Sequence, residues 1–344
     1  MAYTTINKST DYFNTLLYTG TGSTNAVTGV GFQPDMVWIK NRSTTFNHQI
    51  NDAVRGVNKQ IAPNLSNAQE TNTGELTAFG SDGFTVGSGG TLNGNGNNIV
   101  AWNWKANGAG SSNSDGSITS TVSVNTTSGF SIVKYAGTGA SATVGHGLGV
   151  TPGMIICKNL SASEDWVIWI NAFAANQYIR LNTNAAVATS TGMWNNTLPT
   201  SSVFSVNNEE KNNNSGQNII AYCFAEKTGF SKFGSYTGTG DANLGPFIYT
   251  GFKPAFIWVK VNASADSSKI WDNKRPGYNL VDNWLEADDN QAEGSGSNQI
   301  DILSNGFKIR NANTAGNKNN TEIYYMAFAE APLVGSNNVP ATAR

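Results

Sequence analysis

The chain of 344 residues has little charge, and this shortage excludes two classes of protein. Charged residues make up 13% of the chain, about half of the ~25% that is usual for a soluble domain. The 21 basic and 23 acidic residues nearly cancel, so no basic surplus is available to displace counterions from phosphates. The same balance offers no polybasic segment to an anionic membrane. We therefore expect neither a nucleic-acid-binding protein nor a membrane-inserted one.

Long apolar runs and cysteines are scarce as well. No stretch reaches the roughly 18–20 apolar residues that a membrane helix requires. Residues 1–5 lack the basic and apolar blocks of a secretory signal. The two cysteines, Cys157 and Cys223, lie in apolar alternating runs, so we interpret them as small core residues rather than a disulfide framework. Free thiols without a signal fit synthesis in a reducing compartment.

The chain is rich in aromatic residues, with 9 Trp, 11 Tyr and 16 Phe, and it also contains 37 glycines and 46 asparagines. Hydrophobic residues make up 39%, which is enough for a buried core and too much for a disordered polymer. The length permits two or three domains.

One unit occurs three times along the chain, and four markers define it. They are a Tyr-x-Gly-Thr-Gly segment, a proline followed by an apolar strand ending in lysine, a turn leading into a strand with phenylalanine, and a closing aromatic strand. In chain order the markers are residues 18–22, 34–40, Phe84 and Trp104; 135–139, 152–158, Phe204 and Phe224; and 236–240, 254–260, Phe307 and Phe328. The proline-to-phenylalanine spacings are 50, 52 and 53 residues, and the last spacings are 20, 20 and 21. Four markers in one order at near-constant spacing establish the repeat.

Each marker segment has the composition of a β-strand, because it is short, aromatic or β-branched, and bounded by Gly, Asn and Ser. The expected fold class is all-β, with three tandem β-sandwich (jelly-roll-like) repeats of about 100–115 residues. Propeller blades are shorter, at about 40–50 residues. We predict repeat 1 at residues 1–106, a Gly/Ser/Asn linker at 107–114, repeat 2 at 115–227, repeat 3 at 228–331 and a C-terminal tail without strand pattern at 332–344. The short spacer between repeats 2 and 3 predicts that they pack together.

Catalytic constellations are missing from the sequence, so we expect no enzyme, no cofactor and no catalytic metal. His48 and His146 have no His or Cys partner at metal-ligand spacing. The acidic clusters at residues 209–210 and 286–289 do not recur between units, and we interpret them as solvated loop charges or at most a Ca²⁺ site. A glycan depolymerase would need two carboxylates facing each other across a cleft.

Three tryptophans are candidates for contact with a glycan or a partner protein. Trp194, Trp271 and Trp284 fall in variable polar regions, where an exposed ring would suit sugar binding or protein docking. Trp38, Trp102, Trp104 and Trp258 lie in marker strands instead, and we expect them in the core.

Two arginines are further candidates. Arg55 follows Asp52 by three residues and Arg275 follows Asp272 by three, each at the same offset from its marker lysine. In the second unit those offsets fall on Ile170 and Phe173, so the pair is absent there. An Asp–Arg pair most simply fixes a loop through a charge-assisted hydrogen bond. The alternative is that Arg55 and Arg275 contact a neighbouring subunit or a glycan.

The markers of the first unit, together with both ends of the chain, resemble a known family. The segments MAYTTI (1–6), YTGTG (18–22), GFQPDMVWIKNR (31–42), SDGFTVG (81–87), VAWNWKA (100–106), AEAPLVG (329–335) and PATAR (340–344) carry the likeness. They resemble tailed-bacteriophage virion proteins that are frequent in marine phages and usually described as tail-fibre or structural proteins. The second unit departs most, since it lacks the Asp–Arg pair and the Trp-x-Trp close. No catalytic residue is carried over from the family.

The resemblance implies a non-enzymatic virion protein, assembled in the host bacterial cytoplasm. The leading expectation is a tail fibre or tail appendage that helps attach the particle to the host surface. The alternatives are a capsid decoration or head fibre protein, and a carbohydrate-binding module with Trp194, Trp271 and Trp284 as sugar platforms. Expected partners are other virion proteins, a host-surface glycan and further copies of the chain in a homotrimer. Alternatively, the three units of one chain form a pseudo-threefold cluster.

Overall fold

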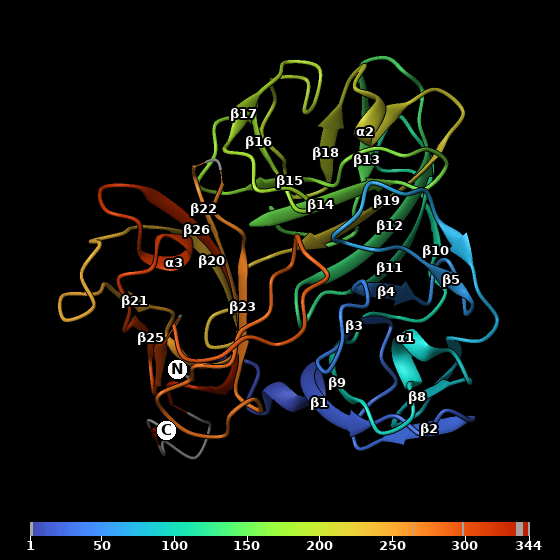
Figure 1. Ribbon diagram of the computed structural model, residues 1–344. Coiled ribbons are helices and arrows are strands. Elements are labelled where there is room, and N and C mark those ends of the chain that lie inside the picture. The colour runs from blue at the N-terminus through green and yellow to red at the C-terminus, as the bar shows by residue number, and fades with distance from the viewer. Residues whose placement is uncertain (1–2, 264, 298, 335–339, 343–344) are drawn as a thin grey trace.

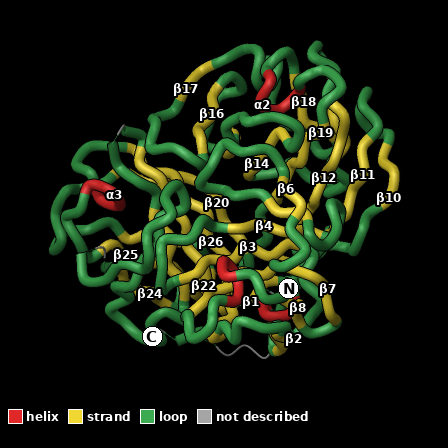
Figure 2. The backbone as a smooth tube through the Cα atoms, turned by 45° about the vertical axis from the view of Figure 1, so that its right-hand side comes forward, coloured by secondary structure: helices red, strands yellow, loops and turns green. Residues whose placement is uncertain are grey.

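The computed structural model describes residues 3–263, 265–297, 299–334 and 340–342. Over these residues the chain is built almost entirely of antiparallel strands, and its helices are single turns (Figures 1 and 2). The all-β expectation is therefore confirmed. Figure 1 shows three lobes that follow the order of the chain, and we refer to them as unit 1 (β1–β9), unit 2 (β10–β19) and unit 3 (β20–β26).

Each unit has an inner sheet that contains the same four strands in the same order. In unit 1 they are β1 (Phe13–Thr19), β9 (Asn98–Trp104), β3 (Met36–Asn41) and β4 (Gln49–Asp52). In unit 3 they are β20 (Ser231–Thr237), β26 (Glu322–Pro332), β22 (Phe252–Val261) and β23 (Lys269–Asp272). In unit 2 the order is β12 (Phe130–Ala136), β19 (Asn218–Phe224), β14 (Met154–Asn159) and β15 (Val167–Ile170), extended by β11 (Ser120–Asn125) and β10 (Ser111–Asn113) at one edge and by β16 (Gln177–Arg180) and β17 (Ala188–Thr189) at the other.

A small outer sheet and a helical turn complete each unit. The outer strands are β2 (Asn25–Thr28), β8 (Gly83–Val86) and β7 (Leu76–Gly80) in unit 1; β13 (Ala142–Gly145) and β18 (Val203–Val206) in unit 2; and β21 (Phe247–Tyr249), β25 (Gly306–Ile309) and β24 (Ile300–Leu303) in unit 3. The helical turns are α1 (Gly90–Asn93), α2 (Glu210–Asn213) and α3 (Thr314–Asn317). Unit 1 also has the 3₁₀ turn η1 (Ser9–Asp11) and the hairpin β5 (Lys59–Gln60) with β6 (Glu70–Thr71).

The Tyr-x-Gly-Thr-Gly marker is explained by the helical turn that lies against it. In unit 1 the hydroxyl of Tyr18 donates to the carbonyl of Leu92 at 2.7 Å, and the buried Asn93 side chain accepts from the amide of Thr21 at 2.8 Å. A Cβ on Gly20 would stand 2.2 Å from a backbone oxygen, so no larger residue fits. Asn213 and Asn317 make the equivalent bonds to Thr138 and Thr239 at 2.9 and 2.8 Å. The marker is thus a structural element of the fold.

The central strands of each inner sheet are buried on both faces, as in β3, where every residue is buried. In unit 1 the side chains of Val37 and Ile39 pack with the outer sheet in a small core of their own. Met36 and Trp38, which alternate with them, belong instead to a larger core that includes residues of all three units. Alternate residues of a strand point to opposite faces, so each inner sheet is one layer of a sandwich and also one wall of a shared interior.

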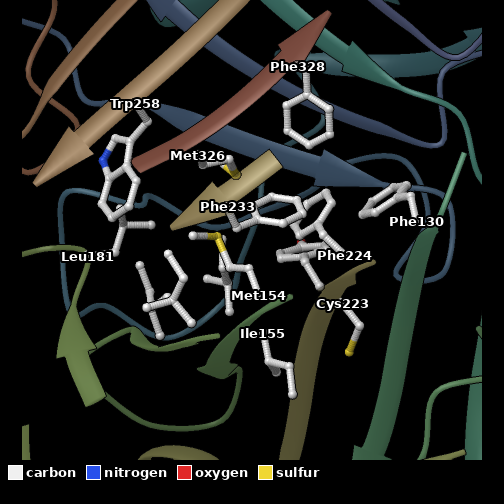
Figure 3. Packing of buried hydrophobic residues seen from close by; sticks show 14 of the residues in the cluster. Phe130, Met154, Ile155, Leu181, Cys223, Phe224, Phe233, Trp258, Met326 and Phe328 are labelled. Carbon is white, nitrogen blue, oxygen red and sulfur yellow. The ribbon is translucent and has the colours of Figure 1, made fainter. Parts of the chain in front are cut away.

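Aromatic rings from the three closing strands meet in this shared core. The ring of Phe328 lies 5.6 Å from that of Trp104 and 5.6 Å from that of Phe224, measured between centroids. Figure 3 shows Phe224, Phe233 and Phe328 beside the sulfur-containing side chains of Met154 and Met326. The marker tryptophans Trp38, Trp102, Trp104 and Trp258 are all at most 2% exposed, as expected. The units therefore share one large hydrophobic interior, in addition to the small core of unit 1.

Two predicted boundaries differ from the structure. The segment predicted as a flexible linker contains β10, which pairs with β11, and its start is held by the buried carboxylate of Asp35. Asp35 accepts hydrogen bonds from the amides of Ala106 at 2.6 Å and Gly108 at 3.0 Å. At the other end, β26 continues to Pro332, and an isolated bridge joins Val334 to Pro340. Residues 335–339 and 343–344 of the predicted tail lie outside the described residues. Units 2 and 3 pack together as predicted.

Candidate functional site

The three units bind one another in cyclic order, because the loop after the fourth inner strand of each unit lies on the next unit. The loop of unit 1 lies on unit 2, where Trp166 Nε1 donates to the carbonyls of Ala62 and Leu65 at 3.0 and 3.1 Å. The loop of unit 2 lies on unit 3, where the amide of Val187 donates to Asn262 Oδ1 at 3.0 Å. The loop of unit 3 lies on unit 1, where Glu293 forms an ion pair with Arg42 at 2.7 Å. The last contact returns to unit 1 and closes the ring.

The first Asp–Arg pair lies at the contact between units 1 and 2. Asp52 Oδ2 accepts from Arg55 Nε at 2.5 Å, and both side chains are at most 1% exposed. The same carboxylate oxygen accepts from the hydroxyl of Tyr222, at 2.7 Å, across the contact. Burial and the negative charge of Asp52 both raise the pKa of Tyr222, so its hydroxyl stays protonated and remains a donor. Arg55 is thus a link inside the chain and is not available to an outside ligand.

The second pair occupies the contact between units 3 and 1 in the same way. Asp272 Oδ2 accepts from Arg275 Nε at 2.5 Å and from the indole of Trp102 at 3.1 Å. The guanidinium of Arg275 also binds Glu293 at 2.6 Å and lies 5.6 Å from the Trp102 ring. Arg275 is 1% exposed. The loop-fixing interpretation of both pairs is therefore correct, with the addition that each pair also binds the neighbouring unit of the same chain.

At the third contact, between units 2 and 3, the equivalent positions are apolar. The strand register aligns Ile170 with Asp52 and Asp272, because each pairs with the residue two after a marker proline. The closing strands likewise align Met326 with Tyr222 and Trp102. A carboxylate thus occurs where the facing unit offers an N–H or O–H donor, and an isoleucine occurs where it offers methionine.

The structure does not support the three candidate tryptophans as sugar platforms. Trp194 is 3% exposed and donates to the carbonyl of Gln177 at 3.1 Å, and Trp271 is fully buried. Trp284 is half-buried, and the ammonium of Lys269 lies 3.8 Å from its ring centroid. The expectation of solvent-reachable rings at Trp194 and Trp271 is wrong, since both contribute to the shared core.

Residues of both acidic clusters make contacts within the protein. The interpretation as solvated loop charges is wrong for Asp288 of the 286–289 cluster, which is buried. Asp288 is 2% exposed and accepts from Ser268 at 3.0 Å. It lies 3.8 Å from the buried ammonium of Lys260. Glu209 accepts from the hydroxyl of Ser190 at 2.6 Å. Within the described residues, no three His, Cys, Asp or Glu side chains are grouped as metal ligands would be.

The two histidines and the two cysteines are buried in the interior. His48 accepts from Trp38 Nε1 at 2.9 Å through Nδ1 and donates to the carbonyl of Glu286, in unit 3, at 2.8 Å through Nε2. Burial and the positive charge of Lys40 lower its pKa well below the usual value, so the ring is neutral. Cys157 and Cys223 are free and fully buried, and burial raises the pKa of both thiols.

On its outer sheet, unit 3 presents exposed aromatic side chains where the other units have small residues. On β21 the outward residues Phe247 and Tyr249 are 46% and 51% exposed. The registers of the outer strands align them with small residues in the other units: Ala26 and Thr143 for Phe247, and Thr28 and Gly145 for Tyr249. We call Phe247 and Tyr249 the unit 3 aromatic face. Since units 1 and 2 form the same sheet without such rings, folding does not require them.

A groove lies beside the unit 3 aromatic face. It has a volume of about 350 Å³ and is lined by Tyr3, Tyr249, Lys227 and Lys232 among others. Tyr3 donates its hydroxyl to the carbonyl of Gly251 at 2.6 Å. Burial, with a contribution from the neighbouring Tyr249, raises the pKa of Tyr3 to about 12. Sequence reasoning missed this surface, although a comparison of the three units at these positions would have found it.

Comparison with known proteins identifies a family. The family described as "Domain of unknown function (DUF7483)" matches residues 8–332, which is most of the chain, and the chain therefore belongs to it. No curated protein matches the chain, and no solved structure matches it. None of the described helices is long and apolar enough to cross a membrane.

Proposed function

We propose that this DUF7483 family member is a non-enzymatic structural protein of a bacteriophage virion, in a tail fibre or tail appendage that attaches the particle to the host surface. The resemblance of its repeat markers to virion proteins supports the class of particle. The unit 3 aromatic face is the main observation in support of a docking role in the particle, because its large rings are exposed and the fold does not need them. Exposed apolar patches of this kind mark sites of protein or ligand contact.

The rest of the molecule supports a structural role. The buried Asp–Arg pairs, the Arg42–Glu293 pair and the shared core join three units into one body. Such a body resists local opening, because each inter-unit contact lies in the interior and is reinforced by hydrogen bonds to charged groups. The unit 3 aromatic face would dock this body onto another virion protein.

A capsid decoration protein is the second candidate, and the cyclic arrangement of the three units favours it. A single chain with three similar lobes has an approximate threefold shape. Such a shape fits a position where three capsid subunits meet, without self-association. Under this alternative the unit 3 aromatic face would contact the shell.

Immunogold labelling of purified particles with antibodies to this chain tests both candidates. Label at the tail supports the first proposal, label over the head supports the second, and unlabelled particles contradict both. Light scattering adds a second criterion, since a mass near three times 36.5 kDa supports a threefold fibre. A Phe247→Ala/Tyr249→Ala variant should fold normally and fail to enter particles. A matched Phe46→Ala variant, which removes an exposed ring elsewhere, should assemble like the wild type.

A further inference from the structure

A second surface feature lies on unit 1, away from the unit 3 aromatic face. It is a pocket of about 240 Å³ between the loop that precedes β4 and the β5–β6 hairpin. In Figure 1, β5 lies at the right margin and β21 at the left. We call it the unit 1 pocket. A water molecule takes up about 30 Å³ of the liquid, so the pocket accommodates a ligand several times larger.

Four of the twelve residues that line the unit 1 pocket carry side-chain amides. The residues that the argument uses are Phe46, Asn47, Gln49, Gln60, Asn67 and Glu70. An amide side chain offers two N–H donors and one carbonyl acceptor, which is the combination that a ligand with several hydroxyl groups needs. Glu70 is the single ionised group among these six. The pocket therefore has the chemistry to bind a neutral polyol.

One of the amides has an acceptor that the protein leaves unused. Gln60 donates through Nε2 to Glu70 at 3.0 Å. Its Oε1 atom is buried and accepts no hydrogen bond from any residue that the structure describes. Buried polar atoms are nearly always paired, and an unpaired one requires an explanation. A ligand hydroxyl in the pocket would supply the missing donor once the Gln60 side chain rotates to bring Oε1 to the pocket surface.

An aromatic ring stands at the mouth of the pocket. Phe46 is 40% exposed, and its Cζ atom lies close to Gly90 at the start of α1, where an added Cβ would be 3.6 Å from Cζ. The start of α1 thus lies beside the tip of the ring. An exposed aromatic face of this kind can pack against the C–H groups of a sugar ring.

The other two units lack this combination at equivalent positions. Counting from the marker lysine, Phe46 corresponds to Glu164 in unit 2 and Asp266 in unit 3. The strand registers align Gln49 with Val167 and Lys269. Because the sister units fold with charged or apolar residues at these positions, the aromatic and amide residues of unit 1 are not a requirement of the fold.

We propose that the unit 1 pocket binds a neutral pyranose residue of a glycan. The sugar packs one face on Phe46 and directs its hydroxyls to Asn47, Gln60 and Asn67. The carboxylate of Glu70 accepts from a further hydroxyl and disfavours acidic sugars. This ligand class rests on the proposed attachment function for its biological meaning, but the pocket can be tested on the purified chain alone.

Saturation-transfer NMR with four methyl glycosides, those of glucose, galactose, mannose and N-acetylglucosamine, tests the assignment. The wild-type chain should saturate at least one of them, and titration gives the affinity. Phe46→Ala should weaken that affinity by about tenfold, the equivalent of one good contact, and Asn67→Ala should weaken it as well. Tyr278→Ala, which removes an exposed aromatic side chain from unit 3 outside both proposed surfaces, should leave it unchanged.

Two results would overturn the assignment. The first is no saturation transfer from the wild-type chain to any of the four glycosides. The second is unchanged binding in both Phe46→Ala and Asn67→Ala, which would place the sugar elsewhere. Circular dichroism of each variant shows whether it is folded, and both replaced residues are exposed. Immunogold labelling is a separate experiment, so failure of the pocket and failure of the virion role can be told apart.

Discussion

Replacing Asp52 by isoleucine should destabilise the whole molecule, although isoleucine is native at the equivalent position of unit 2. The Asp52 carboxylate is fully buried and holds the guanidinium of Arg55 and the hydroxyl of Tyr222. Its removal leaves the buried guanidinium of Arg55 without its counter-ion, which costs about 3–5 kcal/mol. A chain with a free energy of unfolding of about 5–15 kcal/mol would lose a large part of its stability.

The other two replacements that complete the apolar contact should restore much of this loss. Asp52→Ile/Arg55→Phe/Tyr222→Met reproduces in the first contact the residues found at the equivalent positions of the third. Replacing a buried ion pair by well-packed apolar groups is often neutral or stabilising. The triple variant should therefore be more stable than the Asp52→Ile single variant, despite carrying two more substitutions.

Urea unfolding followed by tryptophan fluorescence measures both effects as shifts of the midpoint at constant slope. Because the core is shared, we expect one transition for all three units. Asp11→Ala is the control, since its ion pair with Lys8 is exposed and should contribute less than about 1 kcal/mol. A single variant that loses less than about 1 kcal/mol, or a triple variant less stable than the single one, would refute the reasoning.

Three further predictions concern buried titratable groups. Burial and nearby positive charge lower the pKa of His48 in the folded state, so the unfolded chain binds a proton that the folded one does not. This contribution to stability is complete above about pH 6.5 and is lost below it, and His48→Gln should flatten the pH dependence of the urea midpoint. Burial lowers the pKa of Lys158 from 10.5 to about 8, so the wild type should gain stability relative to Lys158→Met as the pH rises between these values. The buried thiols of Cys157 and Cys223 should react with Ellman's reagent only after unfolding, and fast labelling of the native chain would contradict their placement.

The sequence was sufficient for the features that depend on local pattern. Strand composition and turn residues identified the all-β class, and the spacing of the markers identified three equivalent units, because these signals recur within short segments of the chain. The core placement of Trp38 and Trp258 followed from the same patterns. The pairing of Asp52 with Arg55 also lay within reach, since only three residues separate them.

Tertiary structure alone decided what lies on the surface and what the units share. Trp194 and Trp271 occur in polar segments, yet neighbouring segments cover both rings. The segment Ser111–Asn113 has little strand propensity, and it becomes β10 because the edge of β11 offers it hydrogen bonds. Asp52 meets Tyr222 across 170 positions of the chain. Local composition does not reveal which residues distant in the chain will meet. The cyclic packing of the three units therefore determined which polar residues link the units and which aromatic side chains stayed exposed.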